Sequence, residues 1–366
     1  MTEFSSNLLK WFKTSGRHDL PWQKNVNSYR VWVSEIMLQQ TQVKTVVPYF
    51  ERFMERFPTI DSLSLASIDQ VLHLWTGLGY YARARNLHKT SIIIASELDG
   101  QFPDTIDELV SLPGIGRSTA GAILALSMNK RASILDGNVK RVLTRFFLVQ
   151  GWPEQTKVKN QLWEIADKNT PVRNFSHYTQ AIMDLGATVC KRSSPECLCC
   201  PLNTECKAYI TNQIEDYPGR KPKRLMPAKK VRMYIVENEL GEILLEQRPS
   251  KGIWGALYSF PEKLPTAMLN ESPESDKKLC SIPALPAENC LSTIRHTFSH
   301  FHLEIQPKLV KVLKNEFKLN DSTHRVWYSL ENPAALGLAA PVKKLLAELL
   351  ERSLQEKRPY EQKSTL

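Results

Sequence analysis

The spacing of hydrophobic residues changes once along this 366-residue chain, between residues 217 and 230, and the change separates two regions of different fold. Before it, apolar side chains recur every three or four residues, as on helices that bury one face. After it, apolar and polar side chains alternate, as on strands with one buried face. The sequence therefore predicts a multidomain protein, with a mainly α-helical part at 1–217 and a smaller α+β part at 231–350.

Three segments show the helical spacing most clearly. They are recognised by Trp32, Val33, Ile36 and Met37, by Phe50, Phe53, Met54 and Phe57, and by Val139, Val142, Leu143 and Phe146. Glu35 lies within the first segment. Pro48 and Pro58 bracket the second segment, and because proline disrupts a helix interior, we expect that helix to lie between them.

The second region contains several strand-like runs and one helix. Alternation is clearest at 231–236, 243–245 and 301–305, with Gly241 as a turn between the first two. A late amphipathic helix is predicted at 342–350.

Three further segments are expected to lie outside the regular elements. Residues 218–230 are basic and interrupted by proline, which is typical of an exposed linker. The polar segment 265–278 is predicted to be a loose loop. The tail at 351–366 is predicted to be disordered from Lys357 onward.

The chain is basic, with a formal net charge of +10 at pH 7 and a pI ≈ 9.2. This favours a polyanionic partner such as nucleic acid, because neutralised phosphates release counterions. On charge alone, a solvated basic surface is an equal alternative. No apolar run reaches membrane-spanning length and residues 1–10 do not resemble a signal peptide, so we expect a cytoplasmic protein without a membrane partner.

Four cysteines in the loop 190–206 form the pattern C-x6-C-x2-C-x5-C, made by Cys190, Cys197, Cys200 and Cys206. Thiolates so close together can ligate zinc or an iron–sulfur cluster, whereas a disulfide framework is not expected in a reducing compartment. Zinc sites usually use two separated pairs, so one compact loop favours a cluster. Cys199 adjoins Cys200, and spacing does not decide which of the two is the ligand. Cys280 and Cys290, in the other region, are expected to be inert.

Residues 112–120 read Leu-Pro-Gly-Ile-Gly-Arg-Ser-Thr-Ala and join two helical stretches at about 104–128. Gly114 and Gly116 permit unusual dihedral angles and the close approach of another backbone. The amides at the start of the next helix can hold a phosphate group. The pattern is that of a helix-hairpin-helix element that grips DNA; a tight interhelical turn with glycine caps is the alternative, which the positive charge and the cysteine loop disfavour.

The chain resembles the MutY-type adenine DNA glycosylases of the helix-hairpin-helix superfamily over nearly its whole length. The motifs that carry the resemblance are 20–22, 34–43, 75–85, 112–120, 135–142, 190–206 and 295–302. The resemblance implies one [4Fe-4S] cluster with Cys200, rather than Cys199, as its third ligand. It also implies a bacterial, nucleoid-associated monomer that acts on double-stranded DNA containing adenine opposite 8-oxoguanine or guanine, with contacts to repair or replication proteins.

Release of adenine from deoxyribose calls for two carboxyl groups with different duties, one protonated beside the base and one ionised beside the sugar. Glu35 suits the first duty because burial on an apolar helix raises a carboxyl pKa; a surface glutamate is the alternative. Asp136 suits the second at a helix N-terminus, a position where an ordinary N-cap is also expected. Asn138 is a candidate orienting partner. The resemblance assigns the same duties to Glu35 and Asp136, and places Trp22 near the bound base.

Related superfamily members that also nick DNA carry a lysine two residues after the last hairpin glycine. This chain has Ser118 there, and a hydroxyl group cannot form the Schiff base that strand cleavage requires, so we expect a monofunctional glycosylase. An endonuclease III-like enzyme for oxidised pyrimidines is disfavoured by Ser118 and by the extra C-terminal region. A DNA-binding protein without catalysis is disfavoured by the presence of both Glu35 and Asp136.

An adenine inside a duplex must be flipped out before it can be cleaved. By resemblance, Gln40, Leu78 and Tyr80 wedge into the helix beside the opposing base. For Leu78 and Tyr80 core packing is the alternative, but Gly77 and Gly79 favour a loop.

The second region resembles the Nudix (MutT-like) fold, including residues 251–261. A working Nudix hydrolase needs an acidic helix that holds Mg²⁺, and no such sequence follows Glu262, so we expect a binding domain instead. The resemblance implies that this domain reads the base opposite adenine through Phe298, Ser299 and His300. Without the resemblance, a polar hairpin loop would be the favoured interpretation of these three residues.

Overall fold

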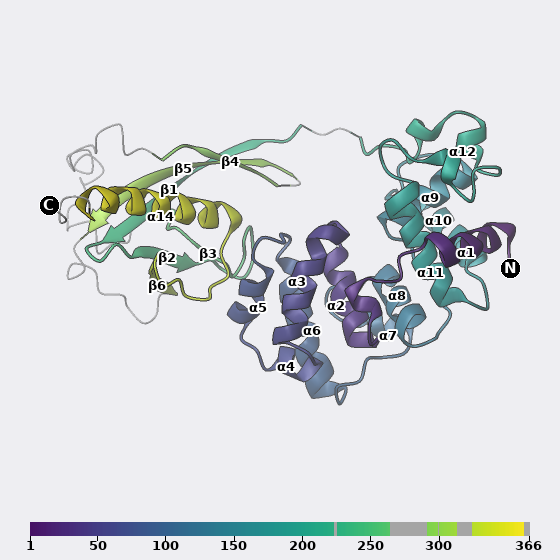
Figure 1. Cartoon of the computed structure of the whole chain (residues 1–366), viewed down its shortest axis with the longest axis horizontal. Helices are drawn as coiled ribbons and strands as arrows, with labels where there is room; N and C mark the ends of the chain where they lie inside the picture. Colours follow the sequence, from purple (N-terminus) through teal and green to yellow (C-terminus); the bar gives the residue numbers. More distant parts are fainter. Residues whose placement is uncertain (223–224, 264–290, 299, 313–323, 362–366) are drawn as a thin grey trace. The chain divides into compact units, whose positions relative to one another are not determined.

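A computed structural model of the chain describes residues 1–222, 225–263, 291–298, 300–312 and 324–361 (Figure 1). The chain forms two compact units. The first comprises residues 1–66 and 83–223, and the second comprises residues 67–82 and 224–366. The first is helical and the second contains a mixed sheet, which confirms the predicted fold class.

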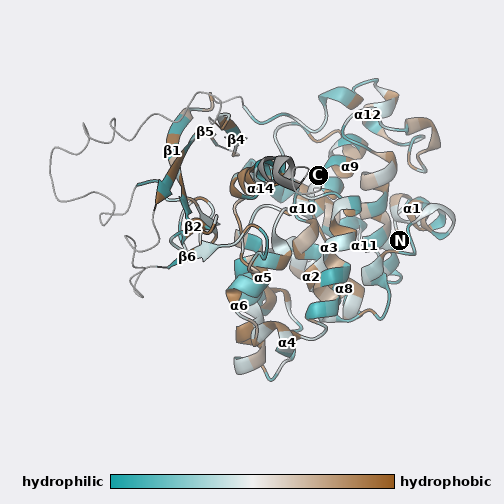
Figure 2. Cartoon of the chain, turned by 60° about the vertical axis from the view of Figure 1, so that its left-hand side comes forward, coloured by the Kyte–Doolittle hydropathy of each residue, from teal (hydrophilic) through white to brown (hydrophobic). Residues whose placement is uncertain are grey.

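The first unit is built from helices and short helical turns. Its helices are α1 (Glu3–Ser15), α2 (Ser28–Leu38), α3 (Val43–Arg56), α4 (Ile60–Ser64), α6 (Ala82–Glu97), α7 (Ile106–Ser111), α8 (Arg117–Ser127), α9 (Gly137–Phe147), α10 (Thr156–Asn169), α11 (Phe175–Asp184) and α12 (Lys207–Ile210). The turns are η1 (Pro21–Gln23), η2 (Leu185–Val189), η3 (Cys197–Cys199) and η4 (Ile214–Asp216). Hydrophobic and hydrophilic residues are mixed along these helices, as expected for elements that bury one face (Figure 2).

Helix α2 lies at the centre of the first unit, where it packs against α3 and α8, and α11 packs in turn against α8 and α1. Trp32, Phe50 and Phe53 are fully buried, which confirms the helical spacing read from the sequence. The expected start of the second helix was wrong, because Pro48 lies inside α3. Pro48 is exposed and lies only one turn into the helix, so the single backbone hydrogen bond that it removes leaves the exposed Lys44 carbonyl to water.

The second unit is organised around six strands. They are β1 (Ala228–Asn238), β2 (Ile243–Gln247), β3 (Tyr258–Ser259), β4 (Ile294–Thr297), β5 (His302–Val312) and β6 (Arg325–Tyr328), in the order β3-β2-β1-β5-β4 with β6 paired to β2. Strands β1 and β5 are parallel along their whole length, from Ala228 beside His302 to Asn238 beside Val312. Strand β1 therefore begins within the segment that the sequence indicates as a linker.

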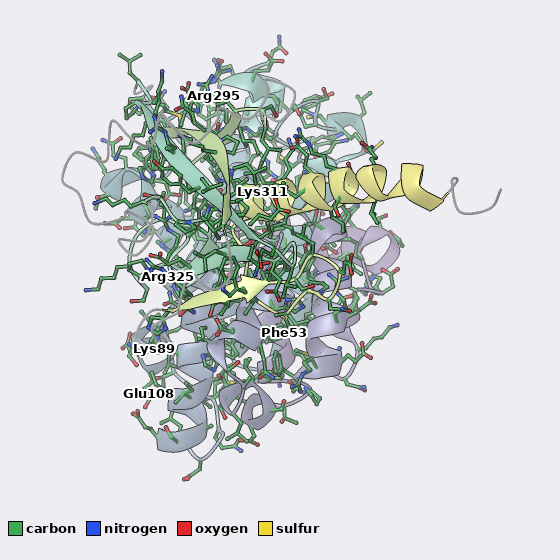
Figure 3. All side chains as sticks on the ribbon, turned by 90° about the vertical axis from the view of Figure 1, so that its left-hand side faces the viewer. Phe53, Lys89, Glu108, Arg295, Lys311 and Arg325 are labelled. Carbon is green, nitrogen blue, oxygen red and sulfur yellow. The ribbon has the colours of Figure 1, made fainter. Side chains whose placement is uncertain are left out.

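Two cross-strand ion pairs join neighbouring strands of the sheet. Arg325 of β6 contacts Glu246 at 2.9 Å, and Lys311 of β5 contacts Glu237 at 3.8 Å. Figure 3 labels both cations among the side chains of the chain. Pairs of this kind contribute little stability in water, so the buried apolar side chains of the strands, such as Met233, Ile235 and Leu245, must hold the sheet together.

The chain ends in helix α14 (Ala340–Glu361), which buries Val342, Leu345 and Leu346. The predicted disorder from Lys357 onward was wrong as far as Glu361, because the helix continues through residues that read as a charged tail. The predicted loop at 265–278, Cys280 and Cys290 lie outside the described residues. No helix within the described ranges is both long and apolar enough to cross a membrane.

Helix α5 (Ile68–Trp75) is separated in sequence from the rest of the second unit but belongs to it by its contacts. Its apolar face, Val71, Leu72 and Trp75, is fully buried. The loop that follows, residues 76–81, is also part of this unit. The sequence places this segment within the helical N-terminal region and gives no sign of its structural neighbours.

Gly121 brings α8 against the extended segment that leads to Asp136, because a Cβ atom at position 121 would collide with the carbonyl oxygen of Ser133. We predict that Gly121→Ala lowers the free energy of unfolding by about 1–3 kcal/mol. A matched control is Gly137→Ala in the first turn of α9, where an added Cβ meets nothing within 4 Å. Urea unfolding of both variants checks this, and equal losses would show that the close approach is not a packing constraint.

Candidate active site and nucleic-acid interface

The first unit contains a cleft of ≈ 1340 Å³ at the end of α2 and the start of α9. It is lined by six of the residues singled out from the sequence, namely Trp22, Glu35, Gln40, Ser118, Asp136 and Asn138. Basic side chains also reach its walls, among them Lys44, Lys191 and Arg192. The fold thus brings residues that are far apart in sequence to one concave surface with a positive rim.

Glu35 is the central acidic group of this cleft. It lies on α2, a helix whose N-cap is Asn27, and the Asn27 side chain accepts a hydrogen bond from Arg30 N at 2.9 Å. Its neighbours on the helix, Ser34 and Ile36, are buried. Burial and, to a smaller extent, the negative charge of Asp136 together raise the pKa of Glu35 from 4.5 to about 8. The carboxyl group therefore holds its proton at neutral pH.

The C-terminus of α2 is fixed by a buried arginine from α6. Arg83 Nη1 donates to the carbonyl oxygens of Ile36 at 2.9 Å, Met37 at 2.7 Å and Gln39 at 2.5 Å. These are carbonyl groups that a helix end leaves without partners. The next residue, Gln40, is exposed with φ of 58°, so the chain turns sharply there into the cleft wall. Sequence analysis did not identify Arg83.

Asp136 is the N-cap of α9, as its position in the sequence predicts. Its Oδ1 accepts a hydrogen bond from Val139 N at 2.8 Å, and its Oδ2 accepts one from Asn138 Nδ2 at 3.3 Å. Burial raises the pKa of Asp136 above its ordinary value, against the backbone amides of Val139 and Asn138 and the charges of Arg141 and Lys140, which lower it. The expectation that this carboxylate is ionised stays a prediction.

Donors and cations make Asp136 the member of the pair that ionises first. No hydrogen-bond donor lowers the pKa of Glu35, and the negative charge of Asp136 raises it. In a coupled pair, the group with the hydrogen-bond donors takes the charge and the other keeps the proton. The arrangement therefore offers one acid and one carboxylate in the same cleft.

Arg141 joins this site to the cysteine loop. Its Nη2 donates to Asn138 Oδ1 at 2.8 Å and to the Gly186 carbonyl at 2.6 Å, and its Nε donates to the Cys190 carbonyl at 2.7 Å. Asn138 is thereby held toward Asp136. Sequence analysis gave Arg141 no role, although its i,i+3 spacing from Asn138 on a helix would have suggested contact.

Ser118 and Trp22 complete the walls of the cleft. Ser118 Oγ accepts a hydrogen bond from Leu135 N at 3.0 Å, which ties the start of α8 to the residue before Asp136. Trp22 is largely buried, and its ring meets Phe50 edge-on at 5.5 Å between centroids. Both side chains are therefore fixed in place by the protein.

The four predicted cysteine ligands line one cavity. Its apolar walls are Val142, Phe146, Leu185, Val189 and Leu202. Cys199 is exposed and does not line this cavity, whereas Cys200 does. Across the described ranges, no three histidine, cysteine, aspartate or glutamate side chains form a site for a single metal ion as they stand.

Positive charge surrounds these cysteines. Buried Arg145 donates from Nη1 to Cys190 Sγ at 3.4 Å, and from Nε to the Tyr217 carbonyl at 2.9 Å. Burial and the neighbouring cysteines together raise the pKa of Cys200 to about 12. Four half-buried thiolates packed together are thus costly by themselves, and their chemistry fits an iron–sulfur cluster, whose irons would offset their charge.

The hairpin between α7 and α8 has the geometry expected for a backbone-binding turn. Gly114 has φ of 82°, and a Cβ there would lie 2.8 Å from Asn86 Cβ, so only glycine fits. Gly116 is the N-cap of α8 without a side-chain capping hydrogen bond, and a Cβ there would meet nothing within 4 Å. The first amides of this helix therefore have no side-chain cap, and the space beside Gly116 is open. Arg117 stands beside them, with its guanidinium 3.9 Å from the Trp163 ring.

Two of the three predicted wedge residues lie in the second unit. Leu78 and Tyr80 lie in the loop 76–81, where Gly77 and Gly79 have φ of 102° and 74°, so the loop predicted from the glycines is confirmed. Leu78 is 6% exposed and Tyr80 is 52% exposed, with Tyr80 also at positive φ. The exposed ring is the one that a partner can reach first.

The predicted opposite-base loop is the tip between β4 and β5. Phe298 stacks on Phe301 with ring centroids 4.7 Å apart and meets Trp254 at 5.3 Å. His300 packs against Phe301 at 4.7 Å. Ser299 lies outside the described residues.

Comparison with known families agrees with both units. Residues 33–168 match the HhH-GPD superfamily base excision DNA repair protein family, and residues 232–348 match the NUDIX domain. A thermostable thymine-DNA glycosylase of known structure has a TM-score of 0.51 and 24% identity, and the match covers 57% of this chain and 95% of that one. This structural likeness supports the helical fold of the first unit.

Curated relatives extend the match to nearly the whole chain. The adenine DNA glycosylase of Buchnera aphidicola subsp. Acyrthosiphon pisum is 41% identical over 348 residues, covering 94% of this chain and 96% of that protein. The adenine DNA glycosylase of Mus musculus is 34% identical over 366 residues, covering 84% of this chain and 70% of that protein. Because an identity of this size spans both units, this chain belongs to the adenine DNA glycosylase family.

Proposed function

We propose that this protein is an adenine-specific DNA N-glycosylase of base excision repair, and that its substrate is adenine paired with 8-oxoguanine or guanine. The family supports the reaction class, and one structural observation carries the mechanism. Glu35, with its pKa raised to about 8, shares a cleft with Asp136, which is held by two hydrogen bonds. An acid and a carboxylate at one site are what cleavage of a glycosidic bond to a purine requires.

Glu35 acts as the general acid. It transfers its proton to N7 of adenine, so that the bond between the sugar C1′ and the base N9 breaks with its electron pair leaving on a neutral base. Water then adds to C1′, and the proton that water loses returns to the carboxylate of Glu35. The products are free adenine and an abasic sugar, and Glu35 is protonated again at the end of the reaction.

Asp136 stabilises the positive charge that develops on the sugar. Its hydrogen bonds from Val139 N and Asn138 fix the carboxylate before substrate arrives, so little reorganisation is needed during the reaction. Arg141 holds Asn138 in turn. The role of these residues is to keep the carboxylate ionised and aimed while Glu35 stays protonated.

DNA is held by elements around the cleft and in the second unit. The open amides at Gly116 and the start of α8 suit a phosphate, and the basic rim of the cleft suits the strand that carries the flipped base. Tyr80, Leu78 and Gln40 support the opposing strand, and the tip at Phe298 reads the base opposite adenine.

Cys190, Cys197, Cys200 and Cys206 hold one [4Fe-4S] cluster. The four line one apolar cavity, and the Arg145 guanidinium donates to the sulfur of Cys190, as hydrogen bonds to cluster thiolates do. Bound there, the cluster supplies a cross-link that braces the loop. Lys191 and Arg192 on that loop then line the active-site cleft in a fixed position.

The pKa of Glu35 predicts the pH dependence of the reaction. Because the protonated form is the active acid, single-turnover excision of adenine opposite 8-oxoguanine should fall as pH rises through about 8. Glu35→Gln should lower the rate by about 10²-fold or more. Glu51→Gln, an exposed glutamate on α3, is the matched control and should leave the rate unchanged. A rate that stays level well above pH 8 would contradict the assignment.

Ser118 predicts the products. With no amine at this position to form a Schiff base, the enzyme should leave an intact strand with an abasic site that breaks only after alkali treatment. Denaturing gels of duplexes with adenine opposite 8-oxoguanine, run with and without alkali, test this. A duplex with thymine glycol should not be processed. Strand breakage at the rate of excision without alkali would exclude a monofunctional enzyme.

Adjacent cysteines provide a matched test of the cluster. Cys200→Ser should lose bound iron and acid-labile sulfide and melt at a lower temperature, because its thiol lines the cavity. Cys199→Ser should keep both, because its side chain is exposed and lies outside the cavity. Metal and sulfide analysis of the purified proteins measures the difference. Zinc found in place of iron would overturn the cluster assignment.

A further inference from the structure

The loop 76–81 is held in shape by aromatic side chains on both of its sides. Trp75, fully buried at the end of α5, donates from Nε1 to the Gly79 carbonyl at 3.1 Å. Tyr81 OH accepts a hydrogen bond from Gly77 N at 3.3 Å. The exposed Tyr80 therefore projects from a loop that is internally braced.

The same tyrosine hydroxyl fastens the loop to the C-terminal part of the chain. Tyr81 OH donates to the Leu338 carbonyl at 3.2 Å, and both side chains are buried. Hydroxyl groups that donate and accept within a buried contact fix the distance between the two segments that they join. We call residues 336–339, which receive this bond, the strip.

Helix α5 lies directly against the strip. A Cβ on Gly337 would be 2.6 Å from Leu72 Cβ, so only glycine permits this approach. His73 Nδ1 lies 3.3 Å from the Leu336 carbonyl. A further contact joins α5 to β2, where Gln247 Nε2 donates to Asp69 Oδ1 at 3.2 Å. Polar and apolar contacts thus run along the full length of the helix.

The strip is also part of the sheet. Tyr258 N of β3 donates to the Gly337 carbonyl at 2.8 Å, and Ala339 N donates to the Tyr258 carbonyl at 3.3 Å. The strip therefore has α5 and Tyr81 as neighbours and is joined by backbone hydrogen bonds to β3. Displacement of the strip would move the loop 76–81 with it.

The segment before β3 leads from the strip to the opposite-base tip. Ala256 N donates to the Arg248 carbonyl at 3.2 Å, which closes the loop 248–256 on itself. Trp254 projects from this loop at a positive φ of 54° and contacts Phe298 at 5.3 Å and His296 at 5.4 Å. An aromatic residue in the left-handed region is strained and persists only when its surroundings fix it.

We propose that the loop 76–81 and the tip at Phe298 are two parts of one rigid structural unit, which we call the frame. Trp254, β3 and the strip hold the tip in this frame, and Tyr81 holds the loop. Binding of the opposing base at the tip therefore also sets the position of Tyr80. This proposal deepens the function given above and rests on it. Tyr81 and Gly337 act as positioning residues, and the ligand of the frame is the strand that carries 8-oxoguanine.

Tyr81→Phe tests the frame, because it deletes both hydrogen bonds and keeps the ring. In full-length protein we expect about fivefold weaker binding to a duplex with a non-cleavable adenine analogue opposite 8-oxoguanine. Binding to the same duplex with guanine should change less than about twofold, since guanine engages the tip less strongly. Gly337→Ala, which separates the strip from α5, should have the same selective effect.

Tyr234→Phe on β1 is the matched control, because Tyr234 lies outside these contacts, and it should leave both affinities unchanged. A double-mutant cycle of Tyr81→Phe with Phe298→Leu measures coupling directly. If the loop and the tip belong to one frame, the fold-loss of affinity in the double variant is smaller than the product of the fold-losses in the two single variants. Multiplicative losses, or equal effects on 8-oxoguanine and guanine, would overturn the proposal. Melting temperatures of all variants separate unfolding from loss of the frame.

The proposed function and the frame fail in different ways. If the wild-type protein shows no adenine excision and no preference for 8-oxoguanine, the proposed function is wrong. If the wild-type protein shows both and Tyr81→Phe behaves like Tyr234→Phe, the frame alone is wrong. A fluorescent purine analogue placed beside the target adenine adds a second readout, because its emission reports the unstacking that insertion of Tyr80 causes.

Discussion

A proton held on Glu35 by burial and by the charge of Asp136 is the constraint on which the rest of the first unit depends. The two carboxyl groups share a cleft, and hydrogen bonds and nearby cations let Asp136 carry the charge while Glu35 stays neutral. Val139 N and Asn138 donate hydrogen bonds to Asp136. Holding Glu35 protonated makes the stability of the fold depend on pH. Because the folded-state pKa of Glu35 lies above its ordinary value of 4.5, the free energy of unfolding falls as pH rises from about 4.5 to about 8, by about 1.4 kcal/mol per pKa unit at most.

Much of the remaining structure keeps this pair in position. Arg83 binds the carbonyl groups at the end of α2, and Gly121 lets α8 approach the segment that leads to Asp136. Arg141 holds Asn138 and the cysteine loop with a single guanidinium. Arg141 thus links the cysteine loop to the active-site cleft, which Lys191 and Arg192 of that loop also line. The cluster proposed at these cysteines would therefore brace one wall of the cleft.

Local patterns in the sequence predicted the parts of the site that are locally determined. Helical spacing placed Glu35 on an apolar helix, and Asp136 was recognisable as an N-cap because capping depends on neighbouring residues. Long-range contacts could not be predicted in this way. No residue near Arg83 in the sequence indicates that it caps a helix from another part of the chain. The apolar face of α5 predicts that the helix is buried but does not identify the residues that it packs against. The sequence did not reveal how deeply Asp136 is buried, for the same reason. The burial of an N-cap residue depends on the helices around it, which the local sequence does not specify.

The structure shows that part of the positive charge counted from the sequence is not available to bind phosphate. A net charge of +10 favours DNA, but Arg83 and Arg145 are buried and use their guanidinium groups on carbonyl oxygens and a cysteine sulfur. Buried arginines contribute to the long-range field yet make no phosphate contact. Lys44 and Arg192, which line the cleft, and the backbone amides at the start of α8 are among the groups placed to meet phosphate. Because some arginines are committed to buried contacts, the total charge alone overstates how many phosphates the protein can neutralise.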